Sequence, residues 1–241
     1  MSEAPVAIIT GAGTGIGRAA AIELAGSGWR CAIVGRRRGK LEETAAAMRE
    51  RNRECESLVL AIDVADPRAA DEIISATVAK WGDRIDALVN NAATLITGPI
   101  HQASDEALRQ SLDVNTVAPA RLVRSVWPLM KKHGGGRIIN VSSMSSVDPF
   151  PGLGVYGMSK AALEGLTRAI NREGNKEGQR DRIIAFNLVL GAVETDMLRS
   201  FASEKMLPRS KAKDPAEIGR VIAAIARGER DGEAGKPIIL T

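Results

Sequence analysis

The sequence predicts an α/β protein with a doubly wound Rossmann fold, in which about seven parallel strands are flanked by helices. Short apolar runs rich in branched residues alternate with longer helical stretches along the whole chain. A glycine-rich turn follows the first apolar run and precedes the first helical stretch. The 241 residues allow one large domain or two small ones, and the alternation without a linker or repeat favours a single domain, residues 1–241.

The predicted elements follow one another in strict alternation. The predicted strands comprise residues 6–10, 31–34, 58–62, 86–90, 137–141, 183–189 and 237–240. The predicted helices comprise residues 16–25, 40–53, 67–81, 104–132, 156–172 and 215–227; the third starts with a proline, and the fourth is a short helix followed by a long one. Strands joined by crossover helices form a parallel sheet that binds ligands beyond the carboxyl ends of its strands.

The composition excludes several functional classes. Hydrophobic residues make up 44% and charged residues 26%, which is typical of a globular protein. The net charge of +4 is weak support for nucleic-acid binding, because only 3% of the residues are aromatic and available for stacking. Two cysteines fit a reducing compartment, no segment approaches the ~18 apolar residues of a membrane span, and residues 1–5 lack signal-peptide features. We therefore expect a cytoplasmic protein without nucleic-acid or membrane partners.

The glycine-rich turn has the pattern G-x-x-x-G-x-G, with Gly11, Gly15 and Gly17. Glycine permits a sharp turn and lets a pyrophosphate approach the backbone, while the following helix offers unpaired N–H groups and a positive dipole end. The alternative interpretation is a tight structural turn. The position of the pattern between a strand and a helix favours a dinucleotide site.

The second predicted strand is followed by Gly35, Arg36, Arg37 and Arg38. Enzymes of this fold that use NAD usually place an acid here, which accepts hydrogen bonds from the ribose 2′-hydroxyl. A guanidinium instead binds a 2′-phosphate through charge-assisted hydrogen bonds. The segment therefore favours NADP(H) over NAD(H), and the alternative is a solvated basic turn at a helix start.

Tyr156 and Lys160 are four residues apart at the start of a predicted helix, so both project from one face. A unit charge at ~4–5 Å from a phenol, at an effective dielectric constant of ~20, lowers its pKa from ~10 toward ~7. Such a tyrosine acts as an acid or base near neutral pH. The alternative is an ordinary pair of neighbours on a helix.

The glycine pattern, the segment Tyr156–Lys160 and the segment Asn90–Ala92, in this order, resemble the classical short-chain dehydrogenase/reductase (SDR) family over essentially the whole chain. The resemblance implies an oxidoreductase that transfers a hydride between NADP(H) and a carbonyl compound or secondary alcohol, with Tyr156 as the acid/base. It implies that Lys160 lowers the tyrosine pKa and holds the nicotinamide ribose. Ser143 has the family's spacing to Tyr156 for the serine that positions the substrate oxygen, and Asn115 matches the helix asparagine that anchors a water-linked proton relay.

The resemblance also implies a set of cofactor contacts and a state of assembly. The implied cofactor-binding residues are Gly11, Thr14, Gly15, Ile16, Gly17, Arg36, Arg37, Asp63, Val64, Asn90, Ala92, Tyr156, Lys160, Val193 and Thr195. For Asp63 the alternative is an Asx turn. No metal is expected, and relatives of this kind form homodimers or homotetramers. The chain departs from the family pattern at three positions: Thr14 stands at the usual basic residue, Ala93 at a glycine and Leu190 at a proline.

Residues 192–213, here termed the lid segment, correspond to the family's variable substrate lid. Its apolar residues, with those of the loop before Tyr156, either line a substrate pocket or pack among themselves: Phe150, Pro151, Leu153, Met197, Leu198, Phe201, Met206 and Leu207. Arg199, Lys205 and Arg209 either bind an acidic substrate or are solvated. Two alternative functions remain open at this point: a 3-oxoacyl-thioester reductase and a non-catalytic NADP-binding sensor.

Overall fold

The computed structural model describes residues 4–175 and 182–241 and confirms the predicted α/β fold. Residues 1–3 of the N-terminal segment discussed above lie outside this part of the chain. Seven parallel strands form one sheet. In sheet order they are β3 (Ser57–Ala61), β2 (Arg30–Gly35), β1 (Val6–Thr10), β4 (Ala87–Asn90), β5 (Gly136–Ser143), β6 (Ile183–Leu190) and β7 (Pro237–Leu240). The strand order reverses between β1 and β4, which is where doubly wound sheets bind their ligands.

Apart from a short helix in the lid segment, which was not predicted, the α-helices lie where the sequence predicts them, with ends that differ by a few residues. They are α1 (Gly15–Gly26), α2 (Arg38–Arg51), α3 (Ala69–Trp81), α4 (Asp105–Leu112), α5 (Ala118–Lys132), α6 (Gly154–Gly174), α7 (Asp196–Phe201) and α8 (Pro215–Ala226). The prediction that α3 starts at Pro67 is wrong, because the helix begins at Ala69. A turn precedes this helix, because the Asp66 carboxylate accepts from the Arg68 N–H at 2.8 Å and the Asp66 carbonyl accepts from the Ala69 N–H.

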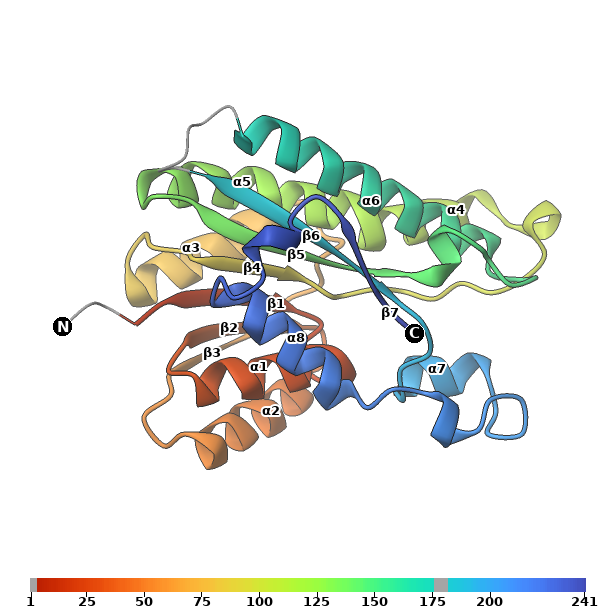
Figure 1. The fold of residues 1–241 in the computed structure, drawn as a ribbon, viewed down its shortest axis with the longest axis horizontal. Coiled ribbons are helices and arrows are strands. Elements are labelled where there is room, and N and C mark those ends of the chain that lie inside the picture. The colour runs from red at the N-terminus through yellow and green to blue at the C-terminus, as the bar shows by residue number, and fades with distance from the viewer. Residues whose placement is uncertain (1–3, 176–181) are drawn as a thin grey trace.

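Two hydrophobic cores cover the two faces of the sheet. Helices α1, α2 and α8 cover one face, and α3, α5 and α6 cover the other (Figure 1). Within β1, Ala7 and Ile9 belong to the first core and Val6 and Ile8 to the second, as strand alternation requires. Because both faces are covered, the strands are mainly apolar, and the sheet offers its ligand site at the edge where the strands end.

Two local features place side chains at that edge. A single π-helical turn, Asp113–Val117, joins α4 to α5 and contains the buried Asn115. Such turns are rare in proteins, and those that occur are often found at functional sites. The lid segment is closed at its base by a bridge between Val193 and Lys213, so α7 and the loop after it project as one excursion beside β6 and β7 (Figure 1). Among the described residues, no helix combines the length and apolar character needed to cross a membrane.

Candidate active site

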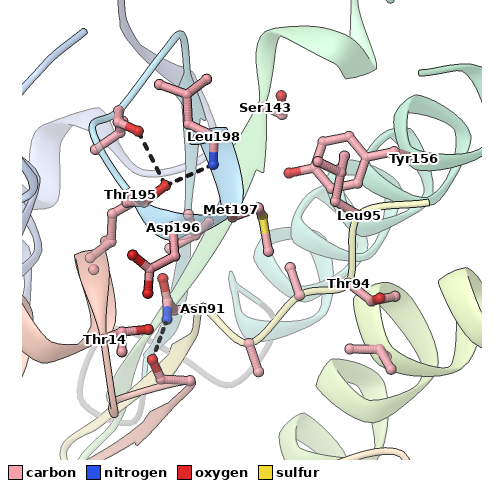
Figure 2. A pocket seen from close by; sticks show the side chains of 18 of the residues that line it. Thr14, Asn91, Thr94, Leu95, Ser143, Tyr156, Thr195, Asp196, Met197 and Leu198 are labelled. Atoms are coloured by element: carbon pink, nitrogen blue, oxygen red, sulfur yellow. Dashed lines mark hydrogen bonds between the residues drawn. The ribbon is translucent and has the colours of Figure 1, made fainter. Parts of the chain in front are cut away.

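A cavity of about 850 Å³ opens at the carboxyl edge of the sheet, with walls from the glycine-rich turn, the loops after β2 to β6 and the lid segment. It brings together most of the residues that the sequence singles out. The predicted site residues that line it are Gly11, Thr14, Gly15, Ile16, Arg36, Arg37, Asp63, Val64, Ala92, Ser143, Tyr156, Lys160, Val193 and Thr195. Figure 2 shows Thr14 and Asn91 toward one end of the cavity and Ser143 and Tyr156 toward the other.

The glycine-rich turn is fixed by its neighbours. Gly11 has a φ of 66°, and a Cβ atom there would lie 2.7 Å from Asn91 Nδ2. A Cβ atom on Gly15, with a φ of 54°, would lie 3.0 Å from Thr195 Cγ2 on the opposite wall. Only glycine fits a backbone of this kind without strain. Glycine at these positions therefore lets the turn pack closely against Asn91 and Thr195 in front of the N-terminus of α1.

Asn91 was missed by the sequence analysis as a site residue. Its Nδ2 donates to the carbonyls of Thr10 at 2.9 Å and Gly11 at 3.2 Å, and the side chain lines the cavity. The Thr10 hydroxyl accepts from the N–H groups of Asn91 and Ala92, both at 3.0 Å. These bonds join the ends of β1 and β4, the two strands that flank the reversal of the sheet.

The arginine segment after β2 stands at the N-terminus of α2. Arg36 and Arg37 are exposed and line the cavity, and the first turn of α2 carries no acidic residue. Lys40 pairs with Glu43 at 2.8 Å and also lines the cavity. In the described part of the chain, no carboxylate lies within ion-pair distance of Arg36. Three cations at the positive end of a helix dipole form a site for an anion.

Predicted site residues also lie in the loops after β3 and β6, where Asp63 and Thr195 line the cavity. Asp63 lines the cavity and also makes the alternative Asx turn, since its Oδ1 accepts from the Ala65 N–H at 3.1 Å. The Thr195 hydroxyl caps α7 by accepting from the Leu198 N–H at 3.2 Å (Figure 2). The turn at Leu190, which lacks the family's proline, is held by a 2.9 Å bond from the Gly191 N–H to the Leu240 carbonyl. Ala93 needs no glycine, because no described residue other than glycine has a positive φ.

Ser143, Tyr156 and Lys160 converge at the reacting end of the cavity. Ser143 is the last residue of β5, and its hydroxyl accepts from the Ser145 N–H at 3.1 Å. Tyr156 lies in the first turn of α6 with Lys160 one turn further on. The buried Lys160 Nζ donates to the Val141 carbonyl at 2.7 Å and lies 5.7 Å from the centre of the Tyr156 ring. The arrangement places a hydroxyl, a phenol and an amine around one space.

The predicted lowering of the Tyr156 pKa is wrong for this structure. Burial raises the pKa of Tyr156 to about 12, and the neighbouring Ser143 side chain acts in the opposite direction with a smaller effect. Burial also lowers the pKa of Lys160 from 10.5 to about 8. Desolvation is the largest cause of both pKa shifts, and the Lys160 amine is directed to the Val141 carbonyl. The Tyr156 phenol therefore keeps its proton at neutral pH.

The buried lysine has a consequence for stability. The folded protein releases the Lys160 proton near pH 8 and the unfolded chain near 10.5, so the free energy of unfolding rises with pH between these values through this group. At about 1.4 kcal/mol for each pH unit, burial of the charged amine costs about 3 kcal/mol at pH 7. Lys160→Met removes that cost and one hydrogen bond worth about 1 kcal/mol. We expect it to stabilise the protein by about 2 kcal/mol at pH 7 and by about zero at pH 10.

Urea unfolding at the two pH values measures this difference. Lys236→Met is the matched control, because Lys236 is exposed and its replacement should change the free energy of unfolding equally little at both pH values. A Lys160→Met protein that is less stable than the wild type at pH 7, or equally shifted at both pH values, contradicts the buried-amine interpretation.

Three predicted site residues lie behind the cavity wall and do not line it. A Cβ atom on Gly17 would lie 2.4 Å from the Gly11 carbonyl oxygen, so this glycine lets α1 approach the turn. Asn90 is a strand residue in register with Asn140, and its Nδ2 donates to Asn140 Oδ1 at 2.8 Å inside the sheet. Asn90 is therefore corrected to an interior residue, with Asn91 in its place at the cavity.

Asn115 holds the wall from behind. Its Nδ2 donates to the Thr94 carbonyl and to Ser159 Oγ, both at 2.9 Å, and its Oδ1 accepts from the Thr94 N–H at 2.8 Å. Thr94 lines the cavity after β4, and Ser159 precedes Lys160 on α6. Asn115 thus joins two walls of the site, and both its Nδ2 and its Oδ1 are hydrogen-bonded.

Comparison with known proteins agrees with this fold. The family model of the short chain dehydrogenases matches residues 5–206. The chain therefore belongs to the short-chain dehydrogenase family of oxidoreductases.

Individual relatives support the same family. An uncharacterized oxidoreductase of Thermotoga maritima is 39% identical over 165 residues, which are 68% of this chain and 64% of the relative. Human dehydrogenase/reductase SDR family member 4 is 34% identical over 166 residues, 68% of this chain and 59% of that protein. The matched segment thus spans less than two thirds of either relative's length. The solved structure of L-sorbose reductase from Gluconobacter frateurii with NADPH and L-sorbose has a TM-score of 0.88 and 26% identity, covering 99% of this chain and 95% of that one.

Proposed function

We propose that the protein is an NADP(H)-dependent oxidoreductase that interconverts a carbonyl compound and a secondary alcohol. One observation carries the proposal: a single cavity joins a glycine turn, a helix N-terminus and unpaired arginine at one end to Ser143, Tyr156 and Lys160 at the other. A dinucleotide needs the first set of groups and carbonyl chemistry needs the second. We further propose that one domain holds both, since both ends belong to this cavity.

The residues present fit the dinucleotide. A Cβ atom would lie 2.7 Å from Asn91 Nδ2 on Gly11 and 3.0 Å from Thr195 Cγ2 on Gly15, so only glycine fits this turn. The turn leads into the N-terminus of α1, which is where a pyrophosphate would bind. Arg36 and Arg37, at the N-terminus of α2, provide charge for a 2′-phosphate. The NADPH bound by the 26% identical L-sorbose reductase supports this choice.

Each group of the cofactor has residues to hold it. The turn from Gly11 to Gly17 would hold the pyrophosphate, Asp63 and Val64 the adenine, Lys160 the nicotinamide ribose, and Val193 and Thr195 the carboxamide. When bound, the nicotinamide supplies or accepts the hydride, and the overall reaction R₂C=O + NADPH + H⁺ → R₂CHOH + NADP⁺ is balanced.

The chain's own residues handle the proton and the substrate oxygen. Tyr156, protonated at neutral pH, donates its phenolic proton to the oxygen as negative charge develops there. The Ser143 hydroxyl donates a hydrogen bond to the same oxygen and fixes its position. Lys160, held by the Val141 carbonyl, keeps a positive charge or a donor beside the phenol. Asn115 keeps the loop at Thr94 and helix α6 in register behind them.

The alternatives make different demands on the same site. A non-catalytic sensor has no use for a serine, a tyrosine and a lysine around one space at the reacting end. A 3-oxoacyl-thioester reductase shares the chemistry and differs in substrate. Assembly into homodimers or homotetramers and a cytoplasmic location stay predictions from the sequence.

The test is NADPH consumption against a panel of ketones, aldehydes, quinones and acyl thioesters. The proposal predicts turnover of at least one simple ketone or aldehyde. Turnover of 3-oxoacyl thioesters alone would establish the alternative enzyme, and binding of NADPH without turnover of any compound would support the sensor.

A further inference from the structure

The substrate end of the cavity is lined by apolar side chains from three separate parts of the chain. Leu95 follows β4, Phe150 and Leu153 belong to the loop before α6, and Met197 and Phe201 belong to α7. Leu95 and Met197 line the same cavity as Tyr156 and are labelled with it in Figure 2. These side chains line the site itself, so the lid segment does more than pack against its own residues.

Two arginines of the lid segment are engaged with other lid groups, and the exposed Lys205 does not line the cavity. Arg199 donates through both Nε and Nη2 to the two oxygens of Glu194, and through Nη1 to the carbonyls of Ala202 at 3.2 Å and Leu207 at 2.8 Å. Arg209 pairs with Glu204 at 2.8 Å. Four bonds from one guanidinium hold the loop after α7 in place, and neither arginine lines the cavity.

The charges that remain at this end do not suit an acid. Of the described residues that line it, Lys160 is the one cation, and its amine is bound to the Val141 carbonyl. A carboxylate placed here would lose its water without gaining a partner, which is unfavourable.

We infer that the site takes uncharged carbonyl compounds with an apolar chain or ring and discriminates against substrates that carry a carboxylate. This inference rests on the proposed function and narrows it. Each methylene that enters an apolar pocket raises kcat/KM by about fourfold until the cavity is filled. The unpaired carboxylate lowers kcat/KM by about tenfold or more.

The experiment compares 2-alkanones from four to ten carbons, and methyl 4-oxooctanoate with 4-oxooctanoate, with NADPH as reductant. We expect kcat/KM to rise along the series and the ester to exceed the acid by at least tenfold. Met197→Lys should raise the ratio of acid to ester by about tenfold, whereas Ser203→Lys, which adds the same charge at an exposed lid position, should leave it unchanged.

The outcomes separate the two claims. A flat chain-length series, or an acid reduced as well as its ester, overturns the inference and leaves the proposed function standing. Absence of turnover with every compound overturns both.

A second, independent observation concerns Glu164, which joins the segment around Ser143 to α6. Glu164 Oε1 accepts from Ser142 Oγ at 2.9 Å and from Ser146 Oγ. These two serines flank Ser143, and Ser146 Oγ also lies 2.6 Å from the Ser143 carbonyl oxygen. Glu164 lies one turn beyond Lys160 and two turns beyond Tyr156 on the same side of α6.

We propose that Glu164 is a positioning residue for Ser143, acting through Ser142 and Ser146. The Glu164 carboxylate thus connects the end of β5 to α6, the helix that carries Tyr156 and Lys160. Small displacements of a positioned donor reduce the rate of the chemical step more than they reduce binding. This proposal also rests on the proposed function, and it predicts an effect on kcat with the KM values for ketone and NADPH unchanged.

Glu164→Ala should lower kcat about tenfold. Glu164→Gln keeps an oxygen acceptor and should restore most of the rate. In a Ser142→Ala, Ser146→Ala background, Glu164→Ala should add less than a twofold loss, because its partners are already gone. Glu173→Ala, an exposed position on the same helix, is the control and should leave kcat unchanged.

The melting temperature of each variant shows whether a loss of kcat comes from displacement of Ser143 or from unfolding of the protein. The proposal is overturned if Glu164→Ala keeps kcat within twofold, if it loses the same factor with and without the two serines, or if Glu164→Gln fails to restore the rate of a normally folded protein. Inactivity of the wild type toward every carbonyl compound overturns the proposed function and this inference with it.

Discussion

Tyr156→Phe is expected to lower kcat by about 10²- to 10⁴-fold, the contribution of a positioned general acid. The substitution removes the phenolic oxygen and keeps the ring, so the packing at the start of α6 should persist. NADPH affinity should stay within threefold of the wild type, because the substitution does not alter the glycine turn or Arg36, which line the cavity. Single-turnover reduction of a ketone and fluorescence titration with NADPH measure the two quantities.

Met158→Ala is the matched control for this variant. Met158 lies two residues further along α6 with 42% of its surface exposed, and its truncation should leave kcat unchanged. A Tyr156→Phe protein that reduces ketones within threefold of the wild-type rate contradicts the assigned role of the tyrosine.

Gly35→Asp combined with Arg36→Ala is expected to reverse the cofactor preference. Each charge-assisted bond to the 2′-phosphate is worth about 1.5–3 kcal/mol, so the loss of Arg36 lowers kcat/KM for NADPH by roughly tenfold to a hundredfold. The new carboxylate repels the phosphate and accepts from a ribose hydroxyl, which favours NADH. The site accepts the aspartate, because a Cβ atom on Gly35 would lie 3.5 Å from Leu41 Cδ2, an ordinary contact.

The ratio of kcat/KM for NADPH to that for NADH is the measurement. Arg38→Ala provides the control, since Arg38 is exposed, does not line the cavity and lies 3.9 Å from Glu42. It should leave the ratio within threefold of the wild type. An unchanged ratio in the double variant rules out the arginine segment as the phosphate site.

The fold could be predicted from the sequence because its determinants are local. Alternation of apolar runs with helical stretches fixes a parallel sheet, and the glycine turn after β1 fixes the ligand edge. Tyr156 and Lys160 could be placed together because one turn of helix separates them. Ser143 depended on its resemblance to a family pattern, and the cavity brings it to the same end.

What the sequence could not provide depends on contacts between distant elements. Asn90 and Asn91 are adjacent and chemically identical, and only the register of β4 against β5 decides which one faces the interior. The pKa of Tyr156 depends on how completely several elements exclude water from it, and burial is the largest cause of its shift. The engagement of Arg199 with Glu194 and two carbonyls likewise follows from the path of the lid segment.

The most direct test of the central claim follows the hydride itself. Wild-type protein is incubated with an apolar methyl ketone and NADPH that carries deuterium at both C4 positions of the nicotinamide, and the alcohol is analysed by mass spectrometry. The account predicts an alcohol with one deuterium on the carbinol carbon, formed at least a hundredfold more slowly by Tyr156→Phe. An alcohol without deuterium, or no alcohol from any ketone at saturating NADPH, contradicts it.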